Sequence, residues 1–378
     1  SVIADALVAA ENPQLATRGH APWAVAVDDA VIAALGRRFG YAEGEVGGVL
    51  TSGGSESNTT ALLAALTSRF PEVGERGVRS LPSDPVAYVS DEGHATIKRA
   101  ARVAGLGAQA VRVVPSGADH RMKPGALGAM IAEDRAAGRT PFFVVATVGT
   151  TSSGAIDPVP EIVAIGRRAG AWVHVDAAWG GLAALVPELA PRLDGVRAAE
   201  SITFDPHKAM SAPMGTGVLL TRRPDVLPRV FAERTGYMPR DGDDDPYGRG
   251  MAWSRRFLGL RVYLPLLACG FEGFAASWRR RLALADALRA ELRARDWEIV
   301  NDSPLPLVCF CDRERRDAKF LDAVARDVVG AGDGWISVPR FANGGRALRA
   351  CVNNHRTEAG DVERLVAGLQ RARAAFRG

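Results

Sequence analysis

Short apolar runs alternate with stretches of helical periodicity between about residues 55 and 220. Most of the runs are apolar throughout, which is typical of strands buried on both faces of a parallel sheet. The pattern therefore predicts a mostly parallel α/β sheet with helices on both faces. The predicted strands are Val86–Val89, Val111–Val114, Phe142–Ala146, Trp172–Val175, Ser201–Phe204 and Gly217–Leu220, and helices are expected after the glycine turn near residue 54, at 123–138 and at 160–169.

The pattern changes after residue 232. Residues 233–255 are rich in glycine, proline and aspartate, and a segment of this length inside a compact protein is usually functional or disordered. Beyond it, the periodicity predicts a smaller α+β domain. Its expected elements are a long helix at 257–294, strands near 297–301, 306–311, 335–338 and 347–352, and helices at 316–329 and from 358. We expect three parts: an N-terminal segment (1–30), a large domain (31–265) and a small C-terminal domain (266–378).

Composition narrows the functional classes. The 378 residues carry a net charge of only +4, without a basic stripe interleaved with aromatic residues, so nucleic acid is not expected as a partner. No apolar run is long enough to span a membrane, and a cytoplasmic location is expected.

The aspartates at 241–245 lack the spacing of a calcium loop, so no metal is expected. The cysteines lack the paired spacing of zinc sites or disulfide frameworks and are expected as reduced thiols: Cys269, Cys309, Cys311 and Cys351.

Two predicted strands lead into side chains that can do chemistry. Asp176 ends the run Trp172–Val175, and Lys208 follows the run Ser201–Phe204 by four residues. The 32 residues between the acid and the lysine span about one strand–helix–strand unit, so the strands are expected to be neighbours. Parallel strands present their carboxyl ends at one rim of the sheet, where ligands collect. An unprotonated lysine amine forms an imine with an aldehyde, although each residue taken alone is more often a solvated charge or a salt-bridge partner.

A polar glycine turn, Thr51–Ser57, opens a predicted helix. Backbone N–H groups at a helix N-terminus favour an anion, although such a turn is equally a plain capping motif. His94 follows another strand, where its ring either stacks on a flat ligand or is satisfied within the loop. Gly180 and Gly181 leave room for such a ligand over the backbone. Together, the amine, the acid and the glycine turn describe a site for an aromatic phosphate aldehyde.

These residues resemble the group II amino-acid decarboxylases, the family of glutamate and aromatic amino-acid decarboxylases that use pyridoxal 5′-phosphate. The resemblance covers roughly residues 12–375 and implies the fold type I architecture, with a mostly parallel seven-stranded sheet and a smaller C-terminal α+β domain. The segments that carry it occur in the family's order: Thr51–Ser57, Asp91–His94, Gly149–Ser152, His174–Ala178, Asp205–Lys208, Trp253–Phe257 and Leu348–Asn354.

The resemblance implies how the cofactor is held. Lys208 would form the covalent imine with it, and His207, Gly54 and Ser55 would contact its phosphate. Many relatives have an asparagine where this chain has Asp205, and a carboxylate near a phosphate is unfavourable unless it pairs with another group.

The resemblance also implies what surrounds the cofactor's ring. Asp176 would pair with the pyridine nitrogen and keep it protonated. Ala178 and His94 would pack on the two faces of the ring, and Thr151 would lie near the ring hydroxyl. Tyr237 lies 29 residues after the lysine, the spacing of the mobile-loop tyrosine that protonates the reacting carbon in similar enzymes.

The expected reaction converts an L-amino acid to its amine and carbon dioxide. Within the family, an aldehyde synthase that couples decarboxylation to oxidative deamination is an alternative, but such relatives tend to lose the loop tyrosine or the stacking histidine. An aminotransferase would use the same cofactor, and a cofactor-binding scaffold without turnover is the alternative from outside enzymes. A homodimer with active sites at its interface is implied by the resemblance alone.

Overall fold

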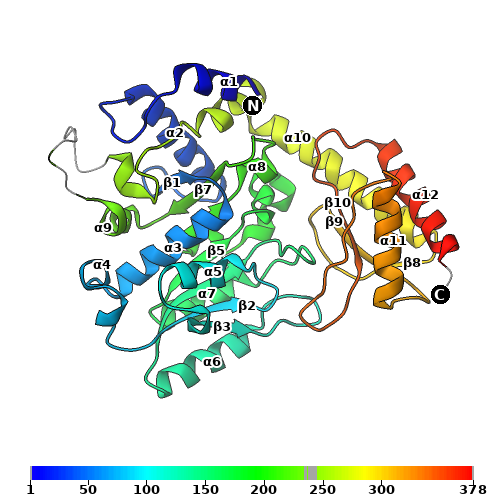
Figure 1. Ribbon diagram of the computed structural model, residues 1–378, viewed down its shortest axis with the longest axis horizontal. Coiled ribbons are helices and arrows are strands. Elements are labelled where there is room, and N and C mark those ends of the chain that lie inside the picture. The colour runs from blue at the N-terminus through cyan, green and yellow to red at the C-terminus, as the bar shows by residue number, and fades with distance from the viewer. Residues whose placement is uncertain (1, 234–235, 237–244, 377–378) are drawn as a thin grey trace.

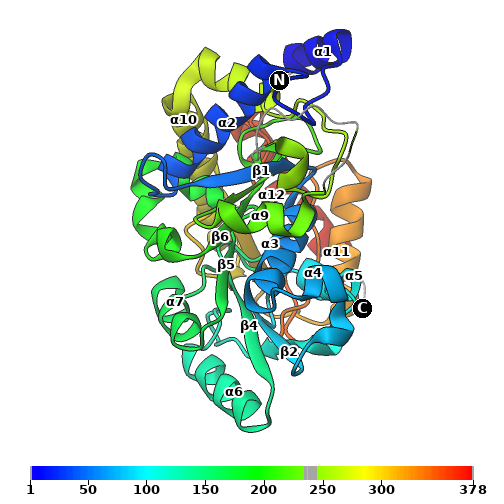
Figure 2. The same ribbon diagram turned by 90° about the vertical axis from the view of Figure 1, so that its left-hand side faces the viewer.

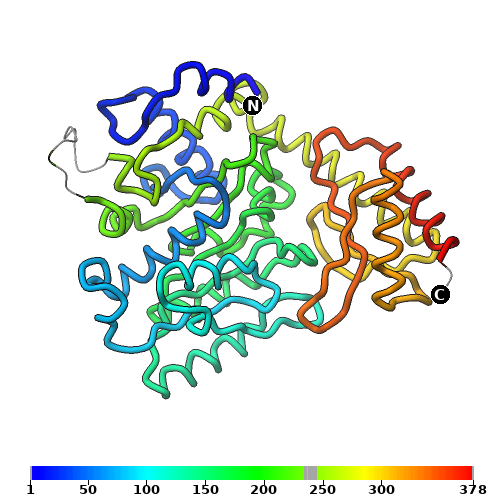
Figure 3. The backbone as a smooth tube through the Cα atoms, viewed as in Figure 1, coloured from blue at the N-terminus to red at the C-terminus, as the bar shows by residue number. Residues whose placement is uncertain are grey.

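The computed structural model describes residues 2–233, 236 and 245–376. A large body built on a seven-stranded sheet and a smaller one built on a three-stranded sheet are connected by α10 (Leu260–Arg293), as Figures 1 and 3 show. This helix changes direction at Gly270, whose φ of +60° is a conformation that other residues rarely adopt. Among the described residues, no helix combines the length and apolar character needed to cross a membrane.

The seven strands of the large sheet follow the order β1-β7-β6-β5-β4-β2-β3. Among the described strands of this sheet, β7 is the one that runs antiparallel to its neighbours, so the prediction of a mostly parallel sheet is confirmed. β1 was not predicted, because Gly47 and Gly48 weaken the strand signal of Val49 and Leu50. The strands are β1 (Gly47–Thr51), β2 (Pro85–Ser90), β3 (Val111–Val114), β4 (Thr140–Thr147), β5 (Trp172–Asp176), β6 (Ser201–Phe204) and β7 (Gly217–Thr221).

Helices cover both faces of this sheet, as Figure 2 shows for α6 and α7 on one side and α3 on the other. On β4, Val144 and Ala146 enter one apolar cluster while Phe143 and Val145 enter the other, because successive strand residues point to opposite faces. This explains the continuous apolar run. The helices of the large body are α1 (Val2–Glu11), α2 (Pro22–Arg38), α3 (Gly54–Arg69), α4 (Val73–Arg76), α5 (Thr96–Val103), α6 (Pro124–Ala136), α7 (Val159–Arg168), α8 (Pro206–Ala209) and α9 (Leu227–Phe231).

The small sheet has the order β10-β9-β8 and is antiparallel. Its strands are β8 (Trp297–Ile299), β9 (Leu307–Asp312) and β10 (Leu348–Cys351), and its apolar cluster is shared with α11 (Ala318–Gly330) and α12 (Ala359–Ala375). The strand predicted at 335–338 is wrong, because only Ser337 pairs, in an isolated bridge with Arg349. Pro339 follows directly, and a proline has no N–H to extend a ladder.

Candidate active site

The carboxyl ends of β4, β5 and β6 meet the start of α3 around a cavity of about 260 Å³. Tyr237 lies outside the described residues. The other residues predicted for the site all line this cavity: Gly54, Ser55, His94, Thr151, Asp176, Ala178, His207 and Lys208. A larger cavity of about 380 Å³ lies beside α2, but its described lining contains no lysine. The 260 Å³ cavity is therefore chosen as the candidate site for the reactive side chains that line it and not for its volume.

Lys208 lies on the short helix α8, directly after β6. Its Nζ is 2.8 Å from Oδ2 of Asp205, and the lysine side chain is 38% exposed whereas that of Asp205 is 1% exposed. A carboxylate at position 205 would be unfavourable beside a phosphate if it were unpaired, but here Lys208 is its cationic partner. Its other oxygen, Oδ1, is buried and has no hydrogen-bond partner among the described residues. The site therefore contains a reachable primary amine held by a buried acid.

His207 is fixed by the loop before β7. Its Nδ1 donates to the backbone carbonyl of Thr216 at 2.8 Å, because a carbonyl oxygen can only accept. Nε2 is thereby left facing Asp205, 3.6 Å from Oδ2. A Cβ on Gly53 would come within 3.1 Å of the imidazole, so the glycine turn and the histidine are in close contact.

The glycine turn brings backbone donors to the same place. Gly53 has φ +142°, and α3 begins at Gly54. In the described part of the chain, the N–H groups of Gly54 and Ser55 have no hydrogen-bond acceptor, as expected in a first helical turn. A Cβ on Gly54 would lie 3.2 Å from both Ala178 Cβ and Asp205 Oδ2. The turn therefore presents two open donors beside His207, an arrangement that suits a phosphate.

Asp176 ends β5 and is 6% exposed. Its Oδ2 accepts from Asn58 Nδ2 at 2.9 Å, and its Oδ1 accepts from the Ala178 N–H at 3.1 Å. A carboxylate fixed by two donors and shielded from water exerts a strong field on a nearby cation.

His174 lies behind this acid and is fully buried. Its Nδ1 contacts Ser201 Oγ at 2.8 Å, and its Nε2 contacts Asn58 Oδ1 at 3.0 Å and Thr203 Oγ1 at 3.2 Å. Burial lowers the pKa of His174 to about 4, although the charge of Asp176 opposes the shift. The imidazole is therefore neutral at pH 7 and leaves the charge of Asp176 uncompensated.

Asn58 connects this acid to His94. Its Nδ2 also donates to Thr96 Oγ1 at 2.9 Å, and Thr96 Oγ1 lies 2.9 Å from His94 Nδ1. The sequence interpretation missed Asn58, Thr96 and the packing role of His174. The one sequence feature that could have indicated Asn58 is that it is the single asparagine on the helix that also carries Ala61 and Leu62.

The assembled residues fit an aromatic phosphate aldehyde. The amine of Lys208 suits the aldehyde, the open N–H groups of α3 suit the phosphate, and the buried carboxylate of Asp176 suits a protonated ring nitrogen. Among the described residues, Asp205 Oδ1 is a buried acceptor beside this cavity that no protein donor satisfies.

Comparison with known proteins agrees with this chemistry. A family model described as the pyridoxal-dependent decarboxylase conserved domain matches residues 1–313. The chain is 31% identical to human cysteine sulfinic acid decarboxylase over 93% of this chain and 75% of that protein. It is 34% identical to L-2,4-diaminobutyrate decarboxylase of Rhizobium meliloti over 86% of this chain and 64% of that protein.

Solved structures give the same result. Mouse CSAD superposes with a TM-score of 0.92 at 29% identity, covering 98% of this chain and 80% of that one. Oryza sativa TDC with PLP and tryptamine has a TM-score of 0.93 at 26% identity, covering 99% and 81%. The chain spans less than two thirds of several of its relatives, including 60% of the tyrosine decarboxylase of Oryza sativa. Sequence, fold and site agree, and the chain belongs to the family of pyridoxal-dependent amino-acid decarboxylases.

Proposed function

We propose that the protein converts an L-amino acid to its amine and carbon dioxide, using pyridoxal phosphate held at Lys208. The observation that carries this proposal is that one cavity contains the Lys208 amine and the buried carboxylate of Asp176. When bound, the cofactor supplies an electron-accepting ring that stabilises the charge left by the departing carboxylate.

The residues around the cavity divide the work of holding the cofactor. Lys208 holds it covalently, and the N–H groups of Gly54 and Ser55 hold its phosphate together with His207. Ala178 and His94 would hold the ring between them, and the presence of both residues on the cavity wall supports this proposal. Thr151, also on the wall, is proposed to contact the ring hydroxyl.

Asp176 keeps the ring nitrogen protonated. Its two fixing donors, Asn58 and Ala178, aim the carboxylate without neutralising it, and the neutral His174 behind it adds no competing charge. The interaction is strengthened by burial, because water does not screen it.

Two further groups act on the reacting atoms and on the lysine. Tyr237, outside the described residues, is proposed to protonate the α carbon after carbon dioxide leaves, on the strength of its spacing from Lys208 alone. Asp205 lies 2.8 Å from Lys208 Nζ and keeps that amine oriented whenever it is free. An aldehyde synthase and an aminotransferase remain the alternatives in enzyme class, and both are distinguished by their products.

The homodimer and the cytoplasmic location are further parts of the proposal. Apolar side chains are exposed on α1, where Val2 and Ile3 are 81% and 72% exposed, and beside the cavity, where Met214 is 78% exposed. A second copy of the chain would cover such side chains and complete the cavity wall. The four cysteines are free thiols, which is consistent with a reducing compartment.

The test is product identification. The purified protein is incubated with pyridoxal phosphate and each amino acid in turn, and the products are assigned by mass spectrometry. An amine with one equivalent of carbon dioxide supports the proposal, and Lys208→Ala serves as the inactive control. An aldehyde with ammonia, or a keto acid, would instead establish one of the alternatives.

A further inference from the structure

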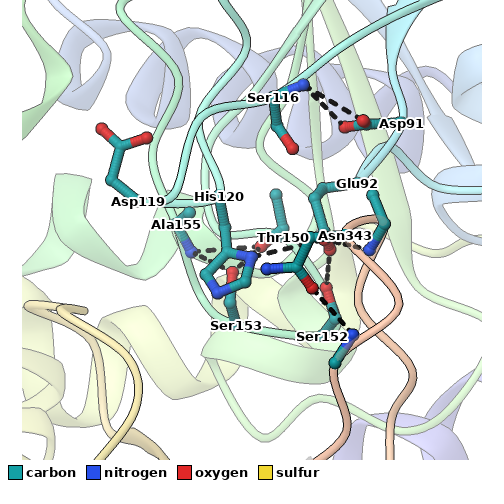
Figure 4. Close-up of polar contacts among 12 residues, drawn as sticks. Asp91, Glu92, Ser116, Asp119, His120, Thr150, Ser152, Ser153, Ala155 and Asn343 are labelled. Atoms are coloured by element: carbon teal, nitrogen blue, oxygen red, sulfur yellow. Dashed lines mark hydrogen bonds and ion pairs between the residues drawn. The ribbon is translucent and has the colours of Figure 1, made fainter.

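Glu92 lies two residues before His94, and its side chain enters a junction of loops where it meets His120 and Ser152 (Figure 4). Its side chain is 3% exposed. Oε1 accepts from the backbone N–H of Ala342 at 2.8 Å and lies 3.4 Å from His120 Nδ1, while Oε2 accepts from the hydroxyl of Ser152. One carboxylate thus contacts the loop after β3, the loop after β4 and a loop of the small body.

The contacts of Glu92 are strong enough to keep it charged. Burial alone would raise the pKa of Glu92, but the hydrogen bonds from His120, Ala342 and Ser152 hold it below the usual value. A buried carboxylate is favourable only with such partners, and it becomes costly when they are removed. Loss of one of these partners would therefore leave a buried charge less well compensated.

His120 completes the junction at a conformational cost. Its φ is +62°, a left-handed backbone conformation that residues other than glycine rarely adopt. The ring packs against Phe341 with centroids 4.4 Å apart, and Phe341 belongs to an apolar cluster with Leu307 and Cys309 of the small sheet. The strained histidine therefore fills the space between the carboxylate of Glu92 and the core of the small body.

The loop that carries Thr151 is bound to the small body from its other side as well. Asn301 Nδ2 donates to the carbonyl of Ser153 at 2.7 Å, and Ser303 Oγ donates to the carbonyl of Gly154 at 2.8 Å. A cleft of about 440 Å³ is lined by residues of the His94 and Thr151 loops and of the small body, and Glu92 is part of its wall. In the described part of the chain, the hydrogen bond from Ala342 N–H to Glu92 joins the His94 loop to the small body.

We propose that Glu92 is a positioning residue that fixes the loops of His94 and Thr151 to small-body residues 339–346, and so couples the placement of the small body to two cofactor-facing side chains. The proposal rests on the roles given above to His94 and Thr151. Glu92 acts through these loops and does not itself contact the cofactor.

The test compares Glu92→Ala, Glu92→Gln and the exposed control Glu363→Ala in the holoenzyme. Hydrogen–deuterium exchange is measured for residues 91–96, 150–154 and 339–346, together with kcat, KM and the Kd for pyridoxal phosphate. For Glu92→Ala we expect faster exchange in all three segments and a loss in kcat/KM of about tenfold or more, because small displacements of positioned groups are costly. Glu92→Gln, which keeps the acceptor for Ala342, should recover part of both effects.

Two results would overturn the proposal. One is faster exchange limited to residues 91–96, and the other is faster exchange in all three segments with kcat/KM and Kd like those of Glu363→Ala. If Glu92→Ala does not fold, His120→Asn replaces it, because asparagine tolerates positive φ; it should speed exchange in residues 339–346, and unchanged exchange there would also refute the coupling. A wild-type protein that makes no amine would refute the proposed function. The coupling between the small body and the two loops is tested separately, by the hydrogen–deuterium exchange of the three segments.

Discussion

Replacing Asn58 with leucine removes the hydrogen bonds that orient Asp176 while keeping a side chain of similar shape. Asn58 donates to Asp176 Oδ2 and to Thr96 Oγ1, and it accepts from Thr203 Oγ1 at 2.7 Å and from His174 Nε2. All of these groups lie in or against the buried wall of the cavity. The substitution therefore tests whether a residue of α3 sets the geometry of the acid on β5.

The expected magnitude follows from which partners are left without a bond. His174 Nε2 and Thr203 Oγ1 still contact one another at 3.2 Å, and His174 Nδ1 still contacts Ser201 Oγ, so neither residue is left without a partner. Asp176 Oδ2 loses the one side-chain donor that the described residues give it, and a buried unsatisfied group costs about 1–3 kcal/mol, more when charged. We expect the free energy of unfolding of the apoprotein to fall by roughly 3 kcal/mol. A reorienting acid should lower kcat by about tenfold to a hundredfold.

The assay is urea unfolding of the apoprotein together with steady-state kinetics. Thr60→Val is the matched control, because Thr60 is buried on the same helix and its hydroxyl has no hydrogen-bond partner among the described residues. If Asn58→Leu unfolds at the same urea concentration as Thr60→Val and keeps its kcat, the reasoning about Asp176 is wrong.

Three further predictions concern separate groups. Lys208→Ala should abolish both the visible absorbance of the bound cofactor and turnover, and normal colour with normal turnover would refute its assignment. In air, Tyr237→Phe should divert product from amine toward aldehyde, ammonia and hydrogen peroxide, with dioxygen as the oxidant, as read by mass spectrometry and a peroxidase assay. Clean amine formation would exclude the proton-donor role. Burial raises the pKa of Asp28 to about 7 despite the nearby charge of Arg255, and Gly259 N–H donates to its Oδ1. Because the pKa of Asp28 is higher in the folded state than in the unfolded state, the wild type loses stability as pH rises from about 4 through 7. Between pH 5 and 8, the free energy of unfolding of Asp28→Asn, measured with urea, should therefore rise by up to about 3 kcal/mol relative to that of the wild type. The same dependence of this free energy on pH in both proteins would contradict the prediction.

Strands with a dense apolar signal were predictable. β4 and β5 are apolar almost throughout, and both predicted strands lie within one or two residues of the observed bounds. β1 was missed because its first two residues are glycines and its pairing with β7 depends on sequence far away. The bridge at Ser337 shows the opposite failure, because a short apolar stretch before Pro339 suggested a strand that the backbone cannot extend.

The candidate site was predictable where a strand end determines position. Asp176 and Lys208 follow adjacent parallel strands, so topology alone places them at one rim. Asn58 approaches that rim from a helix, and nothing in a single sequence says which face of α3 meets β5. Glu92 and His120 come from different loops whose meeting depends on how the small body packs, so no local pattern could reveal them.

The place of β7 in the large sheet has a consequence for biosynthesis. β1 ends at the glycine turn, and β7 is its one partner strand among the described residues, with Thr51 opposite Gly217. At the usual rates of translation the ribosome needs roughly ten to thirty seconds to make the intervening residues. Throughout that time the nascent β1 has an unpaired edge that invites intermolecular association. Chaperone demand should thus peak before residue 221 emerges, and a nonsense mutation upstream of β7 should give a product that aggregates rather than one that retains a partial cofactor pocket.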